Sequence, residues 1–73
     1  MSIHEIKHNY NMAWSSYYNF VQKWQRYANE PADSANNQQM SEMFAHEIQP
    51  RLMMWKILAK ANGVKVHDES EAL

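Results

Sequence analysis

Histidines are the most readily recognised chemical groups of this chain, and two of them have a spacing that suits a metal ion. His4 and His8 are four residues apart, so both side chains would lie on one face of a helix. No third ligand follows at a helical spacing, and Glu5 would point to another part of the helix. We therefore interpret these histidines as solvated side chains near the N-terminus and predict no metal site.

Glu42 and His46, with Glu47 beside them, suggest a di-iron carboxylate site. Such sites need a Glu-x-x-His motif on each of two helices, together with further glutamates. This chain has Glu-x-x-x-His, and its first half offers no inward-facing carboxylate. It also lacks cysteine, a Gly-rich phosphate loop and a serine placed beside histidine and carboxylate. We expect no catalytic residues, no cofactor and no enzymatic activity.

Basic side chains along two predicted helices could contact nucleic acid. The residues concerned are Lys23, Arg26, Lys56 and Lys60. The net charge of −1, from seven Lys and Arg against eight Asp and Glu, argues against a polyanion-binding protein. The acidic C-terminus would also compete with phosphates. A small dimeric nucleic-acid-binding regulator is therefore the alternative function that the sequence leaves open.

The first half of the chain predicts one long amphipathic helix over about residues 3–29. Its apolar residues alternate at spacings of three and four, which keeps them on one side of a helix. Pro31 should end the helix, because the residue before a proline is pushed out of helical geometry. The apolar positions are Ile3, Ile6, Tyr10, Ala13, Tyr17, Phe20, Trp24 and Tyr27, widened by Trp14, Val21 and Ala28.

A second helix is predicted over about residues 34–62. Asp33 or Ser34 can cap its start, and Asn62-Gly63 suits its end. Pro50 removes a backbone hydrogen bond, so it kinks this helix or separates it into two, and we prefer the kinked helix. The sequence thus predicts an all-α antiparallel hairpin in a single domain, residues 1–63. Residues 64–73 have little to bury and are expected to form a flexible acidic tail.

The second helix carries two apolar stripes, and the first helix can cover only one of them. One stripe contains Phe44, Ile48, Leu52, Trp55 and Ala59, and the other contains Met40, Met43, Met54, Ile57 and Ala61. A symmetric homodimer forming a four-helix bundle would cover the second stripe. Alternatively, the methionines form an open docking surface. Glu47 and Arg51, four residues apart between the stripes, are a hypothetical ion pair that sets the dimer register.

Residues outside the predicted core are the candidates for binding another protein. Tyr18 and Met12 lie outside the apolar stripe of the first helix, and Trp14 lies at its edge. The candidate protein-binding residues are Trp14, Tyr18, Met12, Met43, Met54 and Ile57. We expect a small interaction module that binds a larger protein as a regulator, adaptor or inhibitor, as small bacterial and phage proteins of this size often do.

The longest apolar run, Leu52 to Trp55, is too short to span a membrane, and the polar N-terminus lacks a signal peptide. Together with the absence of cysteine, this suggests a soluble cytoplasmic protein.

Overall fold

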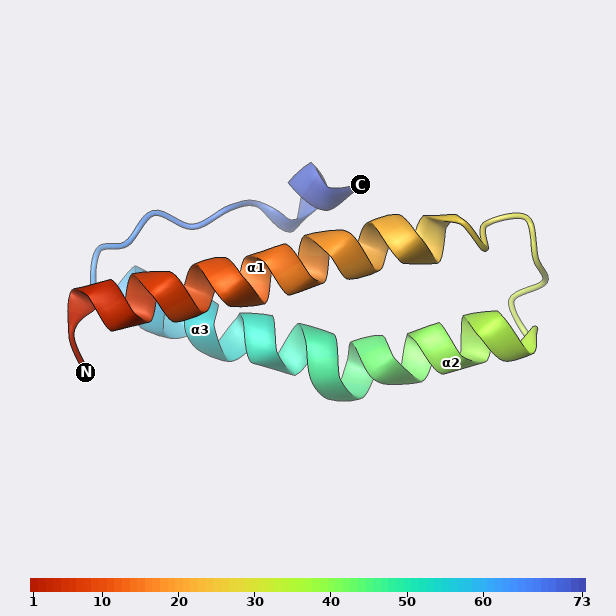
Figure 1. Ribbon diagram of the computed structural model, residues 1–73, viewed down its shortest axis with the longest axis horizontal. Coiled ribbons are helices and arrows are strands. Elements are labelled where there is room, and N and C mark those ends of the chain that lie inside the picture. Colours follow the sequence, from red (N-terminus) through yellow and green to blue (C-terminus); the bar gives the residue numbers. More distant parts are fainter.

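Two long helices lie side by side in the computed structural model, which describes residues 1–73 (Figure 1). The chain is all-α and forms an antiparallel hairpin measuring 43 × 21 × 14 Å. The second arm is continuous from Ala35 to Ala61, as the kinked-helix interpretation predicts. The elements are α1 (Ile3–Gln25), α2 (Ala35–Met43), the π-helical turn η1 (Phe44–Ile48), α3 (Gln49–Ala61) and the 3₁₀ turn η2 (Glu69–Ala72).

Helix α1 is shorter than the sequence predicts. It begins after Ser2, whose hydroxyl accepts a hydrogen bond from the backbone N–H of Glu5. The predicted end near residue 29 is wrong, because residues 26–29 form tight turns instead. Their backbone N–H groups bond to carbonyls three residues back, as Tyr27 does to Trp24 at 2.9 Å. This tighter winding starts the chain reversal well before Pro31.

The second arm begins and ends at the predicted signals. Ser34 caps its start by accepting a hydrogen bond from the N–H of Asn37 at 3.1 Å. Gly63 follows its end with a φ of 73°, a left-handed conformation that glycine adopts without steric cost. These two residues define an arm that is slightly longer than α1.

A π-helical turn directly before Pro50 explains how the second arm stays continuous. The N–H of Gln49 bonds to the carbonyl of Phe44, five residues back, so the turn is wider than in an α-helix. The missing N–H and the ring of Pro50 therefore fall where the α-helical hydrogen bonding is already interrupted. The wide turn also accommodates one extra residue.

This extra residue keeps the core side chains of the second arm aligned. Met40, Phe44, Ile48 and Leu52 follow one another at four-residue steps. In a regular α-helix three such steps would rotate the last side chain by roughly 120° away from the first, at about 100° per residue. The π turn removes most of that rotation, so Met40 and Leu52 are both buried. The predicted methionine stripe is corrected accordingly, because Met40 belongs to the core.

The core lies between the two arms and continues to the C-terminus. Its ten buried residues are Ile6, Tyr10, Ala13, Tyr17, Phe20, Val21, Met40, Leu52, Ala59 and Ala72. Near the loop, the rings of Phe20, Trp24 and Phe44 pack together with centroids 5.6–6.2 Å apart. The predicted apolar stripe of α1 accounts for most of this core.

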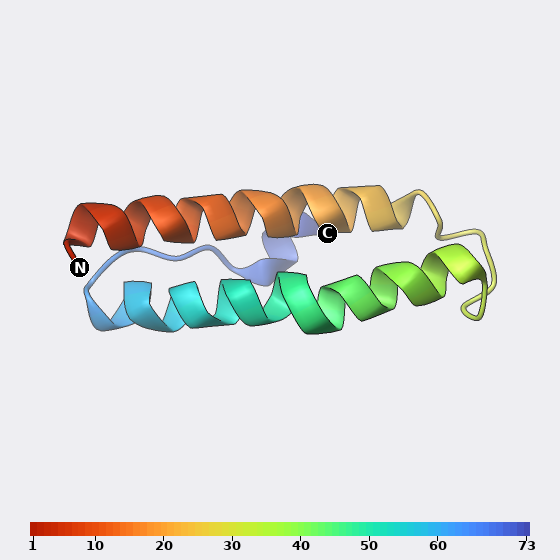
Figure 2. The same cartoon turned by 60° about the horizontal axis from the view of Figure 1, so that its bottom comes forward.

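Residues 64–73 have much more to bury than the sequence suggests. After Gly63 the chain turns back along α1, and Figure 2 shows it behind the two arms, between α1 and α3. Val64 and Val66 pack against the core, and Ala72 is fully buried. We call residues 64–73 the C-terminal segment. The apolar contacts of this segment come from two valines at alternate positions and from one small alanine side chain.

Candidate functional site

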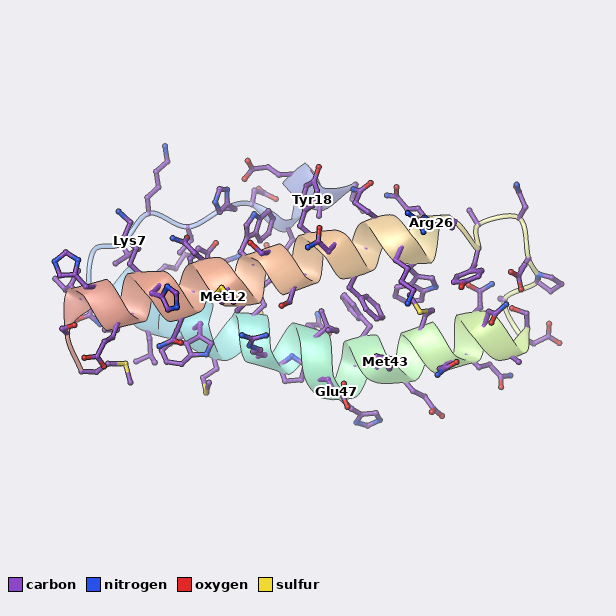
Figure 3. The ribbon with its side chains drawn as sticks, viewed as in Figure 1. Lys7, Met12, Tyr18, Arg26, Met43 and Glu47 are labelled. Atoms are coloured by element: carbon purple, nitrogen blue, oxygen red, sulfur yellow. The ribbon has the colours of Figure 1, made fainter.

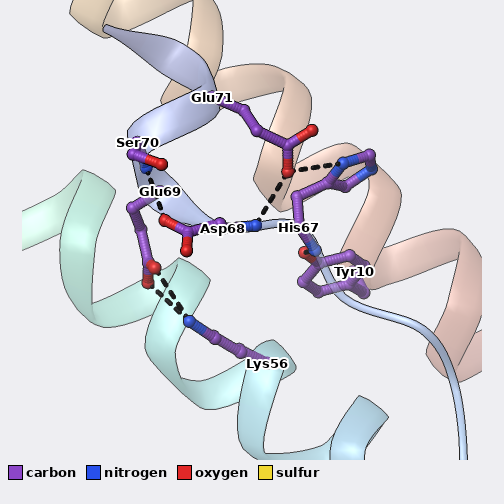
Figure 4. A network of polar contacts seen from close by, with 7 residues as sticks. All are labelled: Tyr10, Lys56, His67, Asp68, Glu69, Ser70 and Glu71. Carbon is purple, nitrogen blue, oxygen red and sulfur yellow. Dashed lines mark hydrogen bonds and ion pairs between the residues drawn. The ribbon is translucent and has the colours of Figure 1, made fainter.

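Four contacts hold the C-terminal segment against the hairpin, and Figure 4 draws two of them, those to Tyr10 and Lys56. The hydroxyl of Tyr10 accepts a hydrogen bond from the backbone N–H of His67 at 2.7 Å. Lys56 on α3 forms an ion pair with Glu69 at 2.8 Å. Gln22 donates to the carbonyl of Ala72, and the indole of Trp14 stacks on the ring of His67. Both helices therefore contribute to the binding of this segment.

The charges of this network stabilise one another. The hydrogen bond from Lys56 holds the pKa of the Glu69 carboxyl below its ordinary value, and the same bond raises the pKa of Lys56. Hydrogen bonding by the backbone N–H of Ser70 lowers the pKa of Asp68. Burial raises the pKa of the Tyr17 hydroxyl, and the charge of Glu69 adds to this effect. These lowered pKa values favour the ionised forms of Asp68 and Glu69 in the docked segment.

An aromatic edge forms where the C-terminal segment crosses α1. The Trp14 ring lies parallel to His67, with centroids 4.7 Å apart and planes 9° apart. Tyr17 stacks on Trp14 at 5.7 Å, and Tyr18 lies tilted at 6.4 Å. Trp14 is half-buried, whereas Tyr18 is 42 % exposed. We call Trp14, Tyr18 and His67 the aromatic edge, and Tyr18 points out from the upper side of α1 in Figure 3.

A polar groove of about 350 Å³ adjoins the aromatic edge. Lys7, Asn11 and Lys65 line it together with His67 and Glu71. The carboxylate of Glu71 lies 3.5 Å from Nδ1 of His67 and also accepts from the N–H of Asp68 at 2.8 Å. An exposed aromatic side chain bordered by charged groups is the usual composition of a protein interface.

The side of the hairpin opposite the C-terminal segment is uncovered. Met12 is two residues from both Tyr10 and Trp14, so it lies roughly 160° around α1 from the segment. It is 50 % exposed, and it shares the near side of the hairpin with Met43 in Figure 3. On this same side, Arg51 of α3 donates a hydrogen bond to the hydroxyl of Ser16 of α1 at 3.1 Å. We call the surface formed by Met12, Met43, Glu47, Arg51 and Met54 the open face.

The structure therefore distributes the six predicted protein-binding residues over three places. Trp14 and Tyr18 belong to the aromatic edge, and Met12, Met43 and Met54 belong to the open face. Ile57, 64 % exposed, lies on the outer edge of α3 with Met53. Glu47 and Arg51 do not pair within the chain, and Arg51 donates a hydrogen bond to Ser16. The sequence did not single out His67 or Met53.

The four cations of the nucleic-acid alternative do not form one patch. Lys56 is half-buried and paired with Glu69. Lys23 and Arg26 lie toward the loop end of the hairpin, whereas Lys60 lies near the other end of the second arm. A phosphate backbone would thus meet at most two neighbouring free cations of this set at a time.

Asn37 organises the loop end, beside a groove of about 570 Å³. Its carboxamide oxygen accepts from the indole N–H of Trp24 at 3.0 Å. Its amide group donates to three loop carbonyls, the shortest contact being 2.9 Å to Pro31. Val21, Trp24 and the C-terminal Leu73 line the groove among others. No pattern in the sequence indicates that Asn37 has this role.

Neither a metal site nor a membrane span is found. No three His, Asp or Glu side chains gather closely enough to hold a metal ion. None of the helices combines the length and apolar character needed to cross a lipid bilayer. Comparisons with protein-family models, curated proteins and solved structures find no match to this chain. The candidate function therefore depends on the surfaces described above.

Proposed function

We propose that this chain is a non-enzymatic interaction module that binds a larger protein through its aromatic edge. The observation that supports this most directly is the exposed ring of Tyr18 beside a Trp14 ring that stacks on both Tyr17 and His67. Tyrosine and tryptophan contribute more than their share of binding energy at protein interfaces. Since stacking already holds Trp14 in place, little conformational entropy is lost when a partner binds.

The polar groove beside the aromatic edge supplies the surroundings that such an interface needs. Lys7 and Lys65 can interact with acidic groups of the partner, while the rings contribute apolar contact. An apolar centre with a polar rim binds protein in a manner that is only weakly sensitive to salt. Acting as a regulator, adaptor or inhibitor requires only that the module cover a surface of its partner.

An affinity capture from a lysate of the source organism tests this proposal. The baits are the wild-type chain, Tyr18→Ala and the matched control Met53→Ala, which is similarly exposed but lies on α3. We expect one protein to be retained at both about 150 and about 500 mM salt by the wild type and by Met53→Ala. We expect Tyr18→Ala to lose that protein at least about tenfold, as for an interface anchor.

The nucleic-acid alternative predicts a different result from the same experiment. Nucleic acid would be retained at low salt and released at high salt, because its binding depends on phosphate contacts. Lys23→Ala or Arg26→Ala would then weaken retention more than Tyr18→Ala. That result, the recovery of no protein, or equal recovery with Tyr18→Ala would contradict binding through the aromatic edge.

A further inference from the structure

The open face leaves part of the second arm without a covering element. Helix α1 covers one side of this arm, and the C-terminal segment covers the side that carries Lys56. Met43 and Met54 remain 37 % and 52 % exposed on the open face. Met12 of α1, 50 % exposed, borders the same surface. Glu47 and Arg51 separate Met43 from Met54, so this surface is apolar at its ends and charged in its middle.

The order of side chains along this face is self-complementary. Met43, Glu47, Arg51 and Met54 follow one another at steps of four, four and three residues. The π turn keeps the four-residue steps aligned, as it does for the core residues. Read along the chain, the row is apolar, acidic, basic, apolar. Read in the opposite direction, it is apolar, basic, acidic, apolar, which is the pattern that complements it.

We propose that the open face binds the open face of a second copy of this chain, with the second arms antiparallel. A two-fold axis between Glu47 and Arg51 places each Met43 against the partner's Met54. It also places each Glu47 opposite the partner's Arg51. A two-fold interface must be self-complementary in this way, because both copies contribute the same patch. Two hairpins joined through these faces form a four-helix bundle.

Both charged residues are available for this pairing. Glu47 is exposed and makes no ion pair within its own chain. Arg51 is exposed, and its single hydrogen bond to Ser16 uses one guanidinium nitrogen. A guanidinium has further N–H groups that can bind a carboxylate at the same time. The hydrogen bond to Ser16 holds Arg51 on the open face, so the partner's Glu47 meets a cation that is already positioned.

This dimer is independent of the proposed binding of a larger protein. The aromatic edge lies on the side of α1 that carries the C-terminal segment, and the open face lies on the opposite side. The contact area is small, so we expect a dissociation constant on the order of 10–100 µM. The test therefore has to cover concentrations well above and below this range.

Charge reversal tests the pairing without removing any apolar contact. Sedimentation equilibrium is measured from about 1 µM to about 1 mM for the wild type, Glu47→Arg and Arg51→Glu. Each single variant places like charges opposite each other twice in a homodimer, so we expect its dissociation constant to rise about tenfold or more. In an equimolar mixture of the two variants, opposite charges face each other again. We therefore expect the mixture to form heterodimers about as tightly as the wild type forms homodimers.

The double variant and two matched controls complete the experiment. The double variant E47R/R51E should form homodimers again, since it only exchanges the two charges. Glu42→Arg and Lys60→Glu change the net charge equally but lie away from the row, so they should dimerise like the wild type. Circular dichroism checks that every variant keeps its helices. A wild type that stays monomeric at about 1 mM would overturn the proposal, as would a mixture that associates no better than the single variants.

Discussion

The Nζ atom of Lys56 lies 2.8 Å from Oε2 of Glu69, and this ion pair joins α3 to the C-terminal segment. Its side chains are 20 % and 36 % exposed, so water screens the attraction only in part. The same carboxylate also contacts Lys56 through Oε1 at 2.9 Å. The pair is the one strong charge contact between the hairpin and the segment, and it makes the docking of the segment sensitive to pH.

Acidification should loosen the C-terminal segment. The pKa of Glu69 in the folded chain is lowered from its ordinary value of 4.5 by the hydrogen bond from Lys56. The stabilisation is therefore complete above about pH 4.5 and is lost as the pH falls through the lower, folded-state pKa. We expect the backbone ¹⁵N order parameter of Ala72, measured by NMR relaxation, to be high at pH 6 and to decrease in this acidic range.

Glu69→Gln should produce the same loosening at pH 6, because glutamine cannot form the ion pair. We expect a loss of about 0.5 kcal/mol in the free energy of unfolding, a value reduced by solvent screening. Glu42→Gln is the control, since Glu42 is exposed and makes no ion pair. If Glu69→Gln kept the same dependence of Ala72 order on pH as the wild type, another group would have to control the docking.

The hairpin was predictable because its determinants are local. Alternating spacings of three and four place Tyr10 and Tyr17 on one side of α1, and both are buried. Ser34 and Gly63 mark the limits of the second arm through their own backbone chemistry. The exposure of Tyr18 also follows from its position outside the apolar stripe. A local pattern of this kind can be read without knowing the tertiary contacts.

The parts that were not predicted depend on contacts between distant residues. His67 acquires its role only by stacking on Trp14, and no local pattern indicates that contact. One local signal in the C-terminal segment could have been used: Asp68 followed three residues later by Glu71 is a capping-box pattern, which marks the start of a helical turn. The three successive four-residue steps from Met40 to Leu52 likewise indicate a π turn once Pro50 is considered. Hydrophobic content alone underestimated how firmly the C-terminal segment is held. The segment binds the helices through the small side chain of Ala72, through a hydrogen bond to Tyr10 and through the ion pair of Glu69 with Lys56.

Asn37 should be the most sensitive polar residue of the loop end. Asn37→Ala leaves the half-buried indole N–H of Trp24 without its acceptor and the carbonyl of Glu30 without its donor. Unpaired polar groups of this kind cost about 1–3 kcal/mol each when fully buried, so we expect a loss of about 1–2 kcal/mol here. Urea denaturation measures this change. Asn36→Ala is the matched control, because Asn36 bonds only to the exposed carboxylate of Glu30, and it should cost less than about 0.5 kcal/mol.

Deleting Ala45, an exposed residue within the π turn, should leave the hairpin folded. The four-residue steps from Met40 to Leu52 then become four, three and four, which a regular α-helix keeps on one side. This deletion and its control are both made with Pro50 replaced by Ala, so that a regular helix meets no proline. Relative to Pro50→Ala alone, we expect unchanged helical circular dichroism and a change of no more than about 1 kcal/mol in the free energy of unfolding. Deleting Met53, an exposed residue of α3, is the control. It rotates Ala59 by roughly 100° out of the core, which should cost about 3 kcal/mol or more because the side chains of α3 lose their packing. Similar losses for both deletions, measured by urea denaturation, would show that the π turn does not set the alignment of the core.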